Sequence, residues 1–278
     1  MTKKLINIKV FIIVHMNRNK YQRLSEEEKE LIRKMTLEGK SLRQISSLMN
    51  LGITTIYYNV RKFKPKQRKK FVCNLNDFQI GELVGAFAGD GNFYHSIKGR
   101  CSKYTIRYFL SYEDDMFYAQ YLTNLLKNMN LNANMFPRKQ GEKWSVIIIN
   151  VYSKEFYNLI KNYLIWEGKK GHTVRLKDNI LAYNPNFLRG FVRGLMDTDG
   201  FVGISNICFA VVSKSLVLNF KDILFLFNIE SKFFTKIRER NRKDLHFCRV
   251  NRPYLDLYHN LFGFSNQRKL DSLLRILK

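Results

Sequence analysis

An eleven-residue segment occurs twice in this chain of 278 residues, and the repeat limits the folds open to it. The first copy, GELVGAFAGDG, covers residues 81–91, and the second, GFVRGLMDTDG, covers residues 190–200. Two glycines, an aspartate and a final glycine keep their spacing, since 190 − 81, 194 − 85, 199 − 90 and 200 − 91 all equal 109. A repeat at this distance indicates two similar halves related by a pseudo-twofold axis.

Both copies are followed by the same order of hydrophobic patterns. Two strand-like runs, an amphipathic helix, two further strand-like runs and another helix are predicted each time. In the first half these are residues 92–97, 104–112, 114–129, 131–138, 144–152 and 154–163; in the second they are residues 201–205, 207–213, 216–227, 232–240, 246–251 and 254–262. A closing helix is predicted over residues 267–277.

The repeated segment itself has the spacing of a tightly packed helix pair. Glycines four residues apart share one helix face, so two such helices can bring their backbones unusually close. These interface glycines are Gly81, Gly85, Gly190 and Gly194. We therefore predict that the two repeated helices pack against each other at the pseudo-twofold axis.

Each predicted helix ends at an aspartate, so Asp90 and Asp199 should lie side by side. This location is unfavourable for anions, because the C-terminal end of a helix is negative and its last carbonyls are unpaired. A divalent cation would balance the charge. Asp90 and Asp199, with the carbonyls of Gly89 and Thr198, would form an all-oxygen site suited to Mg²⁺. Metal ions beside a phosphodiester activate a water nucleophile and neutralise the leaving oxygen, as in many nucleases.

Other interpretations of these acids are weaker. In a calcium loop, Phe201 would stand where the third ligand belongs, and no glutamate closes the loop. The Asp-Thr-Gly of aspartic proteases lies on strands, not on glycine-spaced helices. A role in helix capping alone stays open, although capping would not require the same residue in both copies.

Residues 25–63 predict three short helices that precede the repeat. Ser25 with Glu28, and Ser41 with Gln44, form capping boxes at the start of the first two, and Gly39 ends the first. The turn over residues 51–53 precedes a third helix, capped by Thr54 and continuing to Phe63. This is the pattern of a helix-turn-helix, whose last helix enters the major groove of DNA. Its candidate contacts are Thr54, Thr55, Tyr57, Tyr58 and Arg61; a generic helical hairpin is the alternative.

The charge of the chain points to a polyanionic partner. Lys and Arg number 48 against 23 Asp and Glu, a net charge of +25. Such a charge indicates binding to nucleic acid or an acidic membrane surface and is not needed by an enzyme of small molecules. A basic linker, KFKPKQRKK, covers residues 62–70.

The N-terminus and the cysteines bear on targeting. Residues 1–15 combine Lys3 and Lys4 with an apolar run that is too short to span a bilayer. We interpret them as a leader, with a surface strand and a membrane signal as alternatives. The four cysteines form no CxxC pair, so we expect buried thiols in an intracellular, reducing compartment such as the cytoplasm, the nucleoid or an organelle matrix. The predicted boundaries are a leader (1–20), the helix-turn-helix (21–63), a linker (64–71) and two halves (72–168 and 169–278).

The two copies, LVGAFAGDG (83–91) and VRGLMDTDG (192–200), resemble the two motifs of single-chain LAGLIDADG homing endonucleases. The likeness covers about residues 72–278. It implies an α+β fold in which two αββαββα halves form an antiparallel saddle over the DNA major groove, in addition to the small all-α helix-turn-helix domain. It also implies Mg²⁺-dependent cleavage of both strands at a long asymmetric site, leaving short 3′ overhangs, with Asp90 and Asp199 as the metal-binding acids. Ala88 departs from the motif where an acidic residue is frequent, at a position that does not bind metal.

The resemblance further implies one basic residue per half near the scissile phosphates. Lys169 or Lys170 is the candidate in the first half, and Arg268 or Lys269 in the second. Two or more Mg²⁺ ions are the expected cofactor, with other divalent ions as substitutes. The expected partners are double-stranded DNA and, for a maturase, the host intron RNA, with no membrane; the protein is expected to be a monomer with internal pseudo-twofold symmetry.

Alternation along the strands predicts which residues face DNA. In the first half Lys103, Thr105, Arg107 and Ser111 oppose Tyr104, Ile106, Tyr108 and Leu110. In the second, Lys232, Lys236, Arg238 and Arg240 oppose Phe233 and Ile237. Basic residues on these faces bind any DNA, and only contacts with base edges choose a site.

We therefore expect a site-specific double-strand DNA endonuclease, with a helix-turn-helix that adds affinity or target range. One alternative is a non-catalytic DNA-binding regulator with the same fold, against which the retention of Asp90 and Asp199 argues. Another is an RNA-binding maturase, which the basic sheets permit.

Overall fold

The structure of the chain is a computed structural model that describes residues 23–61, 63, 70–98, 101–239 and 243–278. The predicted leader (1–20) lies outside the described residues. The chain divides into two compact units, residues 1–68 and 69–278. No helix in the described part of the chain is long and apolar enough to cross a membrane.

The smaller unit contains three helices, α2 (Glu26–Leu37), α3 (Leu42–Met49) and α4 (Ile53–Val60). Both predicted capping boxes are present, with Ser25 bonded to Glu28 and Ser41 to Gln44 in both directions. A small core holds the helices together and consists of Ile32, Met35, Ile45, Ile56 and Val60.

The prediction for the third helix is wrong at both ends. Helix α4 begins at Ile53, with Gly52 as its N-cap, so Thr54 is already inside the helix and caps nothing. Because Gly52 occupies the N-cap position, the helix begins two residues earlier than a cap at Thr54 would allow. The helix ends at Val60 rather than Phe63, after the last residue that packs into the small core.

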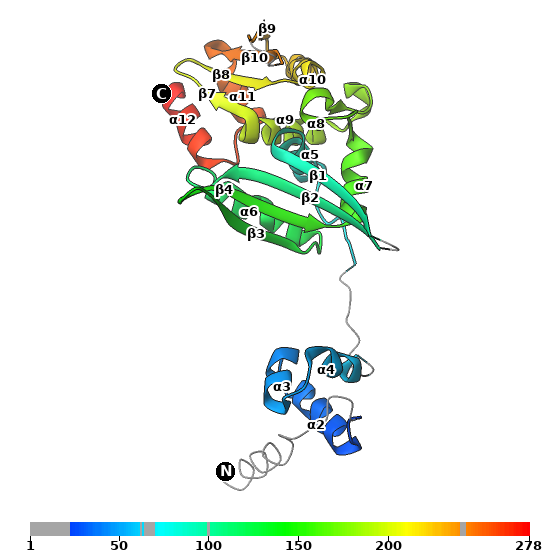
Figure 1. Ribbon diagram of the computed structural model, residues 1–278. Coiled ribbons are helices and arrows are strands. Elements are labelled where there is room, and N and C mark those ends of the chain that lie inside the picture. Colours follow the sequence, from blue (N-terminus) through cyan, green and yellow to red (C-terminus); the bar gives the residue numbers. More distant parts are fainter. Residues whose placement is uncertain (1–22, 62, 64–69, 99–100, 240–242) are drawn as a thin grey trace. The chain divides into compact units, whose positions relative to one another are not determined.

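The larger unit is built on helices α5 (Asp77–Asp90) and α9 (Pro185–Asp199), which contain the two repeated segments. Asn76 caps α5 with Gln79, and Asn184 caps α9 ahead of Pro185, whose fixed backbone suits the first helical position. Both helices lie in the middle of the unit, between its two sheets (Figure 1).

Each helix leads directly into an antiparallel four-stranded sheet. The first has the order β1-β2-β4-β3 and the second β7-β8-β10-β9, so the topologies are the same. The bounds in the first half are β1 (Gly91–Lys98), β2 (Cys101–Ser111), β3 (Ala133–Gln140) and β4 (Lys143–Tyr152). Those in the second are β7 (Gly200–Val202), β8 (Asn206–Val211), β9 (Ser231–Lys236) and β10 (Leu245–Asn251).

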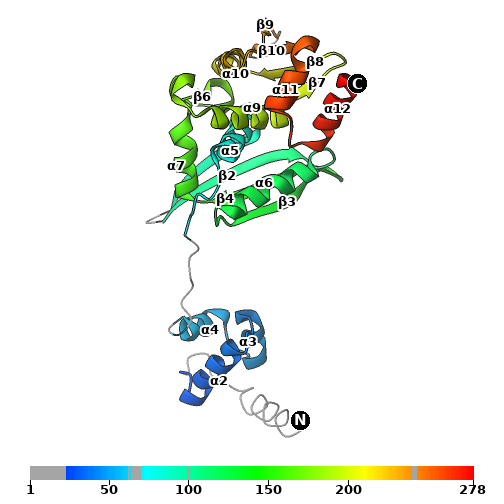
Figure 2. The ribbon, with the colours of Figure 1, turned by 180° about the vertical axis from the view of Figure 1, so that it is seen from behind.

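Helices cover one face of each sheet and leave the other open. Figures 1 and 2 show α6 on only one side of the first sheet. The remaining helices are α6 (Met116–Asn128) and α7 (Lys154–Tyr163) in the first half, and α10 (Lys214–Leu226), α11 (Leu255–Leu261) and α12 (Gln267–Leu277) in the second. The connection between the halves contains β5 (Leu164–Ile165), α8 (Lys170–Thr173), β6 (Arg175–Leu176) and a 3₁₀ turn (Ile180–Ala182); another 3₁₀ turn (Arg252–Tyr254) precedes α11.

The predicted fold class is confirmed, because both halves have the expected order of helices and antiparallel strands around one continuous core. The prediction of buried cysteines is correct for Cys208 and Cys248 and wrong for Cys73, which is exposed.

Candidate functional site

The glycines of the repeat lie where α5 and α9 touch. A Cβ atom on Gly85 would lie 2.2 Å from the carbonyl oxygen of Phe191, and one on Gly194 would lie 2.2 Å from that of Glu82. At the other end of the contact, Gly81 and Gly190 would meet opposing carbonyl oxygens at 2.1 and 1.8 Å. The backbones are therefore in direct contact, and no side chain fits at these positions.

This contact brings the two motif aspartates together. Asp90 ends α5 and Asp199 ends α9. A Cβ atom on Gly89 would lie 2.6 Å from the Oδ2 atom of Asp199, which places that carboxylate against the end of the neighbouring helix. Among the described residues none donates a hydrogen bond to either carboxylate, so their oxygens are free to bind a cation.

The surroundings oppose negative charge on this pair. Burial raises the pKa of Asp90 to about 7, the charge of Asp199 adds to the shift, and Lys170 and Lys269 act against it. Burial likewise raises the pKa of Asp199, again against the two lysines. The pair therefore has a charge that its surroundings do not fully neutralise, and a divalent cation between carboxylate oxygens would do so.

Two lysines cap the C-terminal ends of the motif helices. The Nζ atom of Lys170 donates to the carbonyls of Phe87, Ala88 and Gly89 at 2.7, 2.8 and 2.7 Å.

Lys269 does the same for the other helix. Its Nζ atom donates to the carbonyls of Met196, Asp197 and Thr198 at 2.9, 2.7 and 2.9 Å. The acceptors are equivalent, since 87 + 109, 88 + 109 and 89 + 109 give 196, 197 and 198. Each ammonium group therefore lies at the negative end of one helix and within electrostatic reach of Asp90.

This arrangement corrects the prediction that the last helix carbonyls are unpaired. The carbonyls of Gly89 and Thr198, proposed as metal ligands, each accept a hydrogen bond from a lysine. A carbonyl oxygen has a second lone pair, so metal binding there stays a prediction, but the ammonium group competes electrostatically with a cation. The two carboxylates are the better candidates for ligands. The described residues contain no cluster of three or more His, Cys, Asp or Glu side chains that could hold a metal by itself.

The structure also separates the alternative basic residues. Lys169 is exposed and precedes α8, whereas Lys170 reaches the helix end. Arg268 is half exposed and pairs with Asp114 and Asp115, whereas Lys269 is buried. The burial of both lysines lowers their pKa values, that of Lys170 to about 8.

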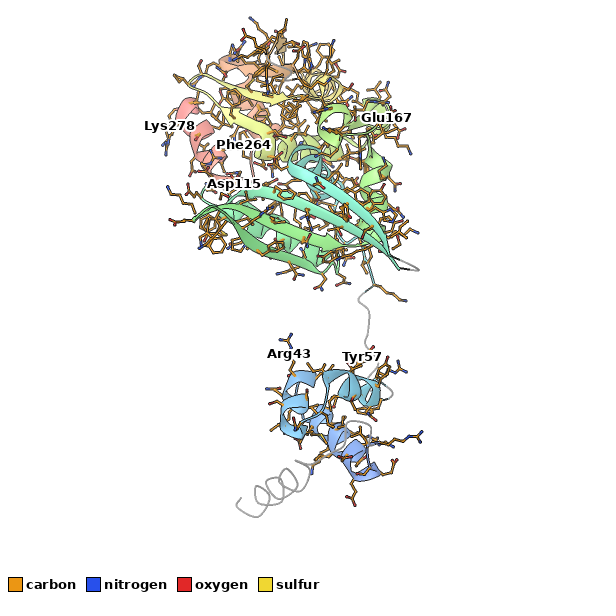
Figure 3. All side chains as sticks on the ribbon, viewed as in Figure 1. Arg43, Tyr57, Asp115, Glu167, Phe264 and Lys278 are labelled. Carbon is orange, nitrogen blue, oxygen red and sulfur yellow. The ribbon has the colours of Figure 1, made fainter. Side chains whose placement is uncertain are left out.

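A buried polar cluster joins the two halves beside this site. Asp197 accepts hydrogen bonds from the backbone N–H groups of Ser265 and Asn266, both at 3.0 Å. The side-chain amide of Asn266 donates to Asp115 at 2.6 Å. Asp115 and Phe264, labelled in Figure 3, mark this junction between the first half and the closing segment of the second. The contacts fix the start of α12 and therefore the position of Lys269.

On the first sheet, Lys103, Thr105 and Arg107 lie on the face opposite the buried residues Ile106, Tyr108 and Leu110, as predicted from alternation. Lys103 lies over the ring of Tyr152, with Nζ 4.2 Å from its centroid.

Two residues of this face are less available for contact with DNA than predicted. Thr105 is nearly inaccessible, at 2% exposure, and its cross-strand partners on both sides are tyrosines, Tyr94 and Tyr152. Ser111 lies at the end of β2, where its hydroxyl donates to Asp114 in the following turn.

On the second sheet, Lys232 and Lys236 are exposed and Phe233 packs against the core, as predicted. The prediction fails beyond Lys236, where β9 ends. Ile237, expected to face the core, is 81% exposed, because alternation no longer applies once the chain leaves the strand. Arg238 lies past the strand end, and Arg240 lies outside the described residues.

Two residues of the open faces were missed. Arg249 is exposed on β10 between the buried residues Cys248 and Val250. Asn150 lies between Ile149 and Val151 and binds Arg107. The signal for Asn150 was a single polar residue within the apolar run of β4, and the signal for Arg249 was its alternation with Val250 and Asn251 in β10.

In the helix-turn-helix unit, Thr54, Thr55, Tyr57, Tyr58 and Arg61 are all exposed. The guanidinium of Arg61 lies 4.5 Å from the ring centroid of Tyr58, and the rings of Tyr57 and Tyr58 meet edge to face. Arg43 on α3 and Tyr57 on α4 are labelled in Figure 3. The surface of α4 therefore combines aromatic and basic groups.

Protein-family models match part of each unit. Residues 186–274 match the LAGLIDADG-like domain family, and residues 20–62 match a helix-turn-helix domain family. The resemblance noted in the sequence is thus confirmed: the chain joins a helix-turn-helix domain to a LAGLIDADG-like fold.

Solved structures with the same fold include homing endonucleases. The crystal structure of I-DmoI in complex with DNA and Ca has a TM-score of 0.54 and 16% identity, with 72% of this chain and 98% of that chain covered. The complex of I-DmoI with DNA and Mn has a TM-score of 0.51 and 16% identity, with 68% and 98% covered. At such identities the likeness establishes the fold.

Two curated relatives come from Methanocaldococcus jannaschii. The replication factor C small subunit is 28% identical over 208 residues, which are 74% of this chain and 10% of the relative. The DNA-directed RNA polymerase subunit Rpo1C is 24% identical over 221 residues, which are 78% of this chain and 23% of the relative. The chain thus spans less than a quarter of the length of either relative.

Proposed function

We propose that the protein is a site-specific endonuclease that hydrolyses phosphodiester bonds in both strands of DNA with the aid of Mg²⁺ or a similar divalent ion. The observation that carries this proposal is the pair of donor-free carboxylates, Asp90 and Asp199, held against each other by glycine contacts and flanked by Lys170 and Lys269.

The donor set fits a hard divalent cation. Asp90 and Asp199 would hold the metal, and water and DNA phosphate would supply its remaining oxygen ligands. When bound, the metal would lower the pKa of a water nucleophile and stabilise charge on the leaving oxygen. The carboxylates are half-buried at the ends of rigid helices, so their positions are set before DNA arrives.

The lysines have two tasks in this proposal. Their ammonium groups offset the negative ends of α5 and α9, and they keep positive charge beside the place where the phosphate would lie. The open sheet faces with Lys103, Arg107, Lys232 and Lys236 would hold the flanking duplex, and α4 of the helix-turn-helix would add contacts with DNA.

The test is cleavage of a plasmid library with randomised sites, with Mg²⁺, by the full-length protein and by Asp199→Asn. We expect double-strand breaks with short 3′ overhangs at one long site, lost with EDTA and in the variant. The Asn side chain keeps the shape of Asp but removes the charge that would bind the metal.

Three results would contradict the proposal. Tight, site-selective DNA binding without cutting would instead assign the chain to non-catalytic regulators. Preferential binding of intron RNA over duplex DNA would indicate a maturase. Unchanged cutting by Asp199→Asn would remove the carboxylate pair from the mechanism.

A further inference from the structure

Each open sheet face has an arginine on one of its two central strands, toward the end of the sheet at which a motif aspartate leads into the first strand. In the first half, β1 starts at Gly91, directly after Asp90, and Gly91 pairs with Tyr108 of β2. Arg107 immediately precedes Tyr108 in β2, so its side chain points to the opposite face of the sheet from the buried Tyr108.

The second half has the same register but a different residue order. Gly200 follows Asp199 and pairs with Phe209 of β8, so Cys208 occupies the position equivalent to Arg107. The cross-strand partner of Cys208 in β10 is Arg249, whereas the partner of Arg107 in β4 is Asn150. The arginine of this cross-strand pair is thus on β2 in the first half, and in the second half it is on β10, the equivalent of β4.

Arg107 is held in place by a hydrogen-bonded chain. Its Nε atom donates to the Oδ1 atom of Asn150 at 3.0 Å, and the Nδ2 atom of Asn150 donates to the hydroxyl of Tyr152 at 2.6 Å. Asn150 is 6% exposed, so it has little freedom to move. Within the described part of the chain, the two terminal nitrogens of Arg107 donate to no protein acceptor, which leaves a pair of parallel donors for a ligand.

Arg249 is held in place by stacking. Its guanidinium carbon lies 4.9 Å from the ring centroid of Phe234, and that ring stacks on Phe247 with centroids 4.7 Å apart and planes 4° apart. The side chain of Arg249 is exposed, and it also hydrogen-bonds the thiol of its cross-strand partner Cys208. The first arginine is thus fixed by an amide and the second by an aromatic pair.

We propose that Arg107 and Arg249 are the innermost base-reading residues of the two halves, and that each binds the O6 and N7 atoms of a guanine in the major groove. In the major groove, the two parallel donors of a fixed guanidinium group match the O6 and N7 acceptors of guanine. Asn150 and Phe234 are positioning residues for the two forks. This inference rests on the proposed function, because it assumes that the open faces lie in the major groove.

The register also predicts an asymmetric target. Arg107 lies on β2, but Arg249 lies one strand further across its sheet, on β10, and neighbouring strands are about 4.8 Å apart. The two guanines are therefore not expected at mirror-related positions about the centre of the site.

The experiment is selection of bound duplexes from a randomised library by the full-length protein, with EDTA present so that no site is lost by cutting. We expect the wild-type protein to enrich guanine at one inner position in each half-site. Arg107→Gln should reduce the preference for guanine about 5- to 150-fold at one position only, and Arg249→Gln at the other only. Arg107→Lys keeps the charge but lacks the fork, so it should lose the preference as well.

Matched variants distinguish the recognition of bases from effects on folding and from nonspecific binding through positive charge. Asn150→Asp keeps an acceptor for Arg107 and should keep the guanine preference, whereas Asn150→Leu should weaken it at the same position as Arg107→Gln. Lys232→Gln, on the same face as Arg249, should weaken binding uniformly across sequences.

Three outcomes would overturn the inference. Unchanged guanine preferences in both arginine variants would exclude base reading, and an even loss of affinity over all sequences would make the arginines phosphate contacts. A wild-type protein that enriches no sequence would remove the DNA recognition on which the proposed function rests. If the arginine variants instead bind DNA with the same sequence preference as the wild type, only the present inference fails.

Discussion

Glu82 of α5 and Phe191 of α9 occupy equivalent positions of the repeat, because 82 + 109 equals 191, and both are fully buried. Ala88 and Asp197 form a second such pair, at 88 + 109. Glycines, terminal aspartates, strand register and capping lysines agree between the halves, whereas these buried positions differ in chemistry. The comparison teaches that the backbone contact and the ends of the helices are constrained in both halves, while the side chains that surround them are not.

The largest expected effect concerns the glycine contact that both halves share. Gly85→Ala and Gly194→Ala should each lower the free energy of unfolding by about 3 kcal/mol, because each new Cβ atom would lie 2.2 Å from an opposing carbonyl oxygen. Chemical denaturation measures the loss. Gly171→Ala is the control, since nothing lies within 4 Å of its Cβ position. Losses confined to one of the two glycines would contradict a symmetric contact.

The second prediction compares the two capping lysines. Lys170→Met and Lys269→Met should each slow cleavage about 100-fold, because each removes positive charge next to Asp90. If each half serves one strand, nicked DNA should accumulate, with the nick on opposite strands in the two variants. Strand-specific labelling of the products measures this. Lys169→Met should cut as the wild type does, and equal slowing by that variant would mean that bulk charge alone is responsible.

The third prediction uses Glu82, a buried acid whose equivalent in the second half is Phe191. Burial raises the pKa of Glu82 above its usual 4.5, against hydrogen bonds from Ser265 and Tyr121 and the charge of Arg193. The folded state therefore keeps a proton that the unfolded chain releases, so the stability this proton provides is present below pH 4.5 and is lost as pH rises through the raised pKa.

Glu82→Gln removes that titration. In the wild-type protein the Oε1 atom of Glu82 has no hydrogen-bond partner, and its Oε2 atom accepts a hydrogen bond from the hydroxyl of Tyr121 at 2.7 Å. The carbonyl oxygen of a glutamine can keep the bond from Tyr121. We expect the variant to be more stable than the wild type at pH 8 by roughly 1 to 2 kcal/mol and no more stable at pH 4.5. Unfolding curves at both pH values test this, and a gain independent of pH would show that Glu82 does not titrate in this range.

The smallest expected effect lies in the helix-turn-helix unit. Arg61→Gln should weaken DNA binding only a few-fold. In a plot of the logarithm of the binding constant against the logarithm of the salt concentration, it should reduce the magnitude of the slope by about one. Affinity measured at several salt concentrations tests this, with Arg33→Gln on α2 as the comparison variant. A change in which sequence is bound, rather than in how tightly, would make Arg61 a base contact instead of a phosphate contact.

Much of the fold was predictable because its patterns are local. The capping boxes at Ser25 and Ser41 and the period-two alternation in β2 are decided by neighbouring residues. The errors also have local causes: Gly52 starts α4 earlier than Thr54 would, and Ile237 lies beyond the end of β9.

The sequence alone determined that two similar halves exist, which helices contact each other and which aspartates end them, because glycine spacing and the repeat distance of 109 are written in the chain. Only the tertiary structure decided which lysine reaches each helix end, since Lys170 and Lys269 come from segments more than 70 residues away from their acceptors. The same holds for the pairs Arg107 with Asn150 and Arg249 with Cys208. Strand pairing joins residues about 40 positions apart, and local sequence patterns contain no information on which strand lies beside which.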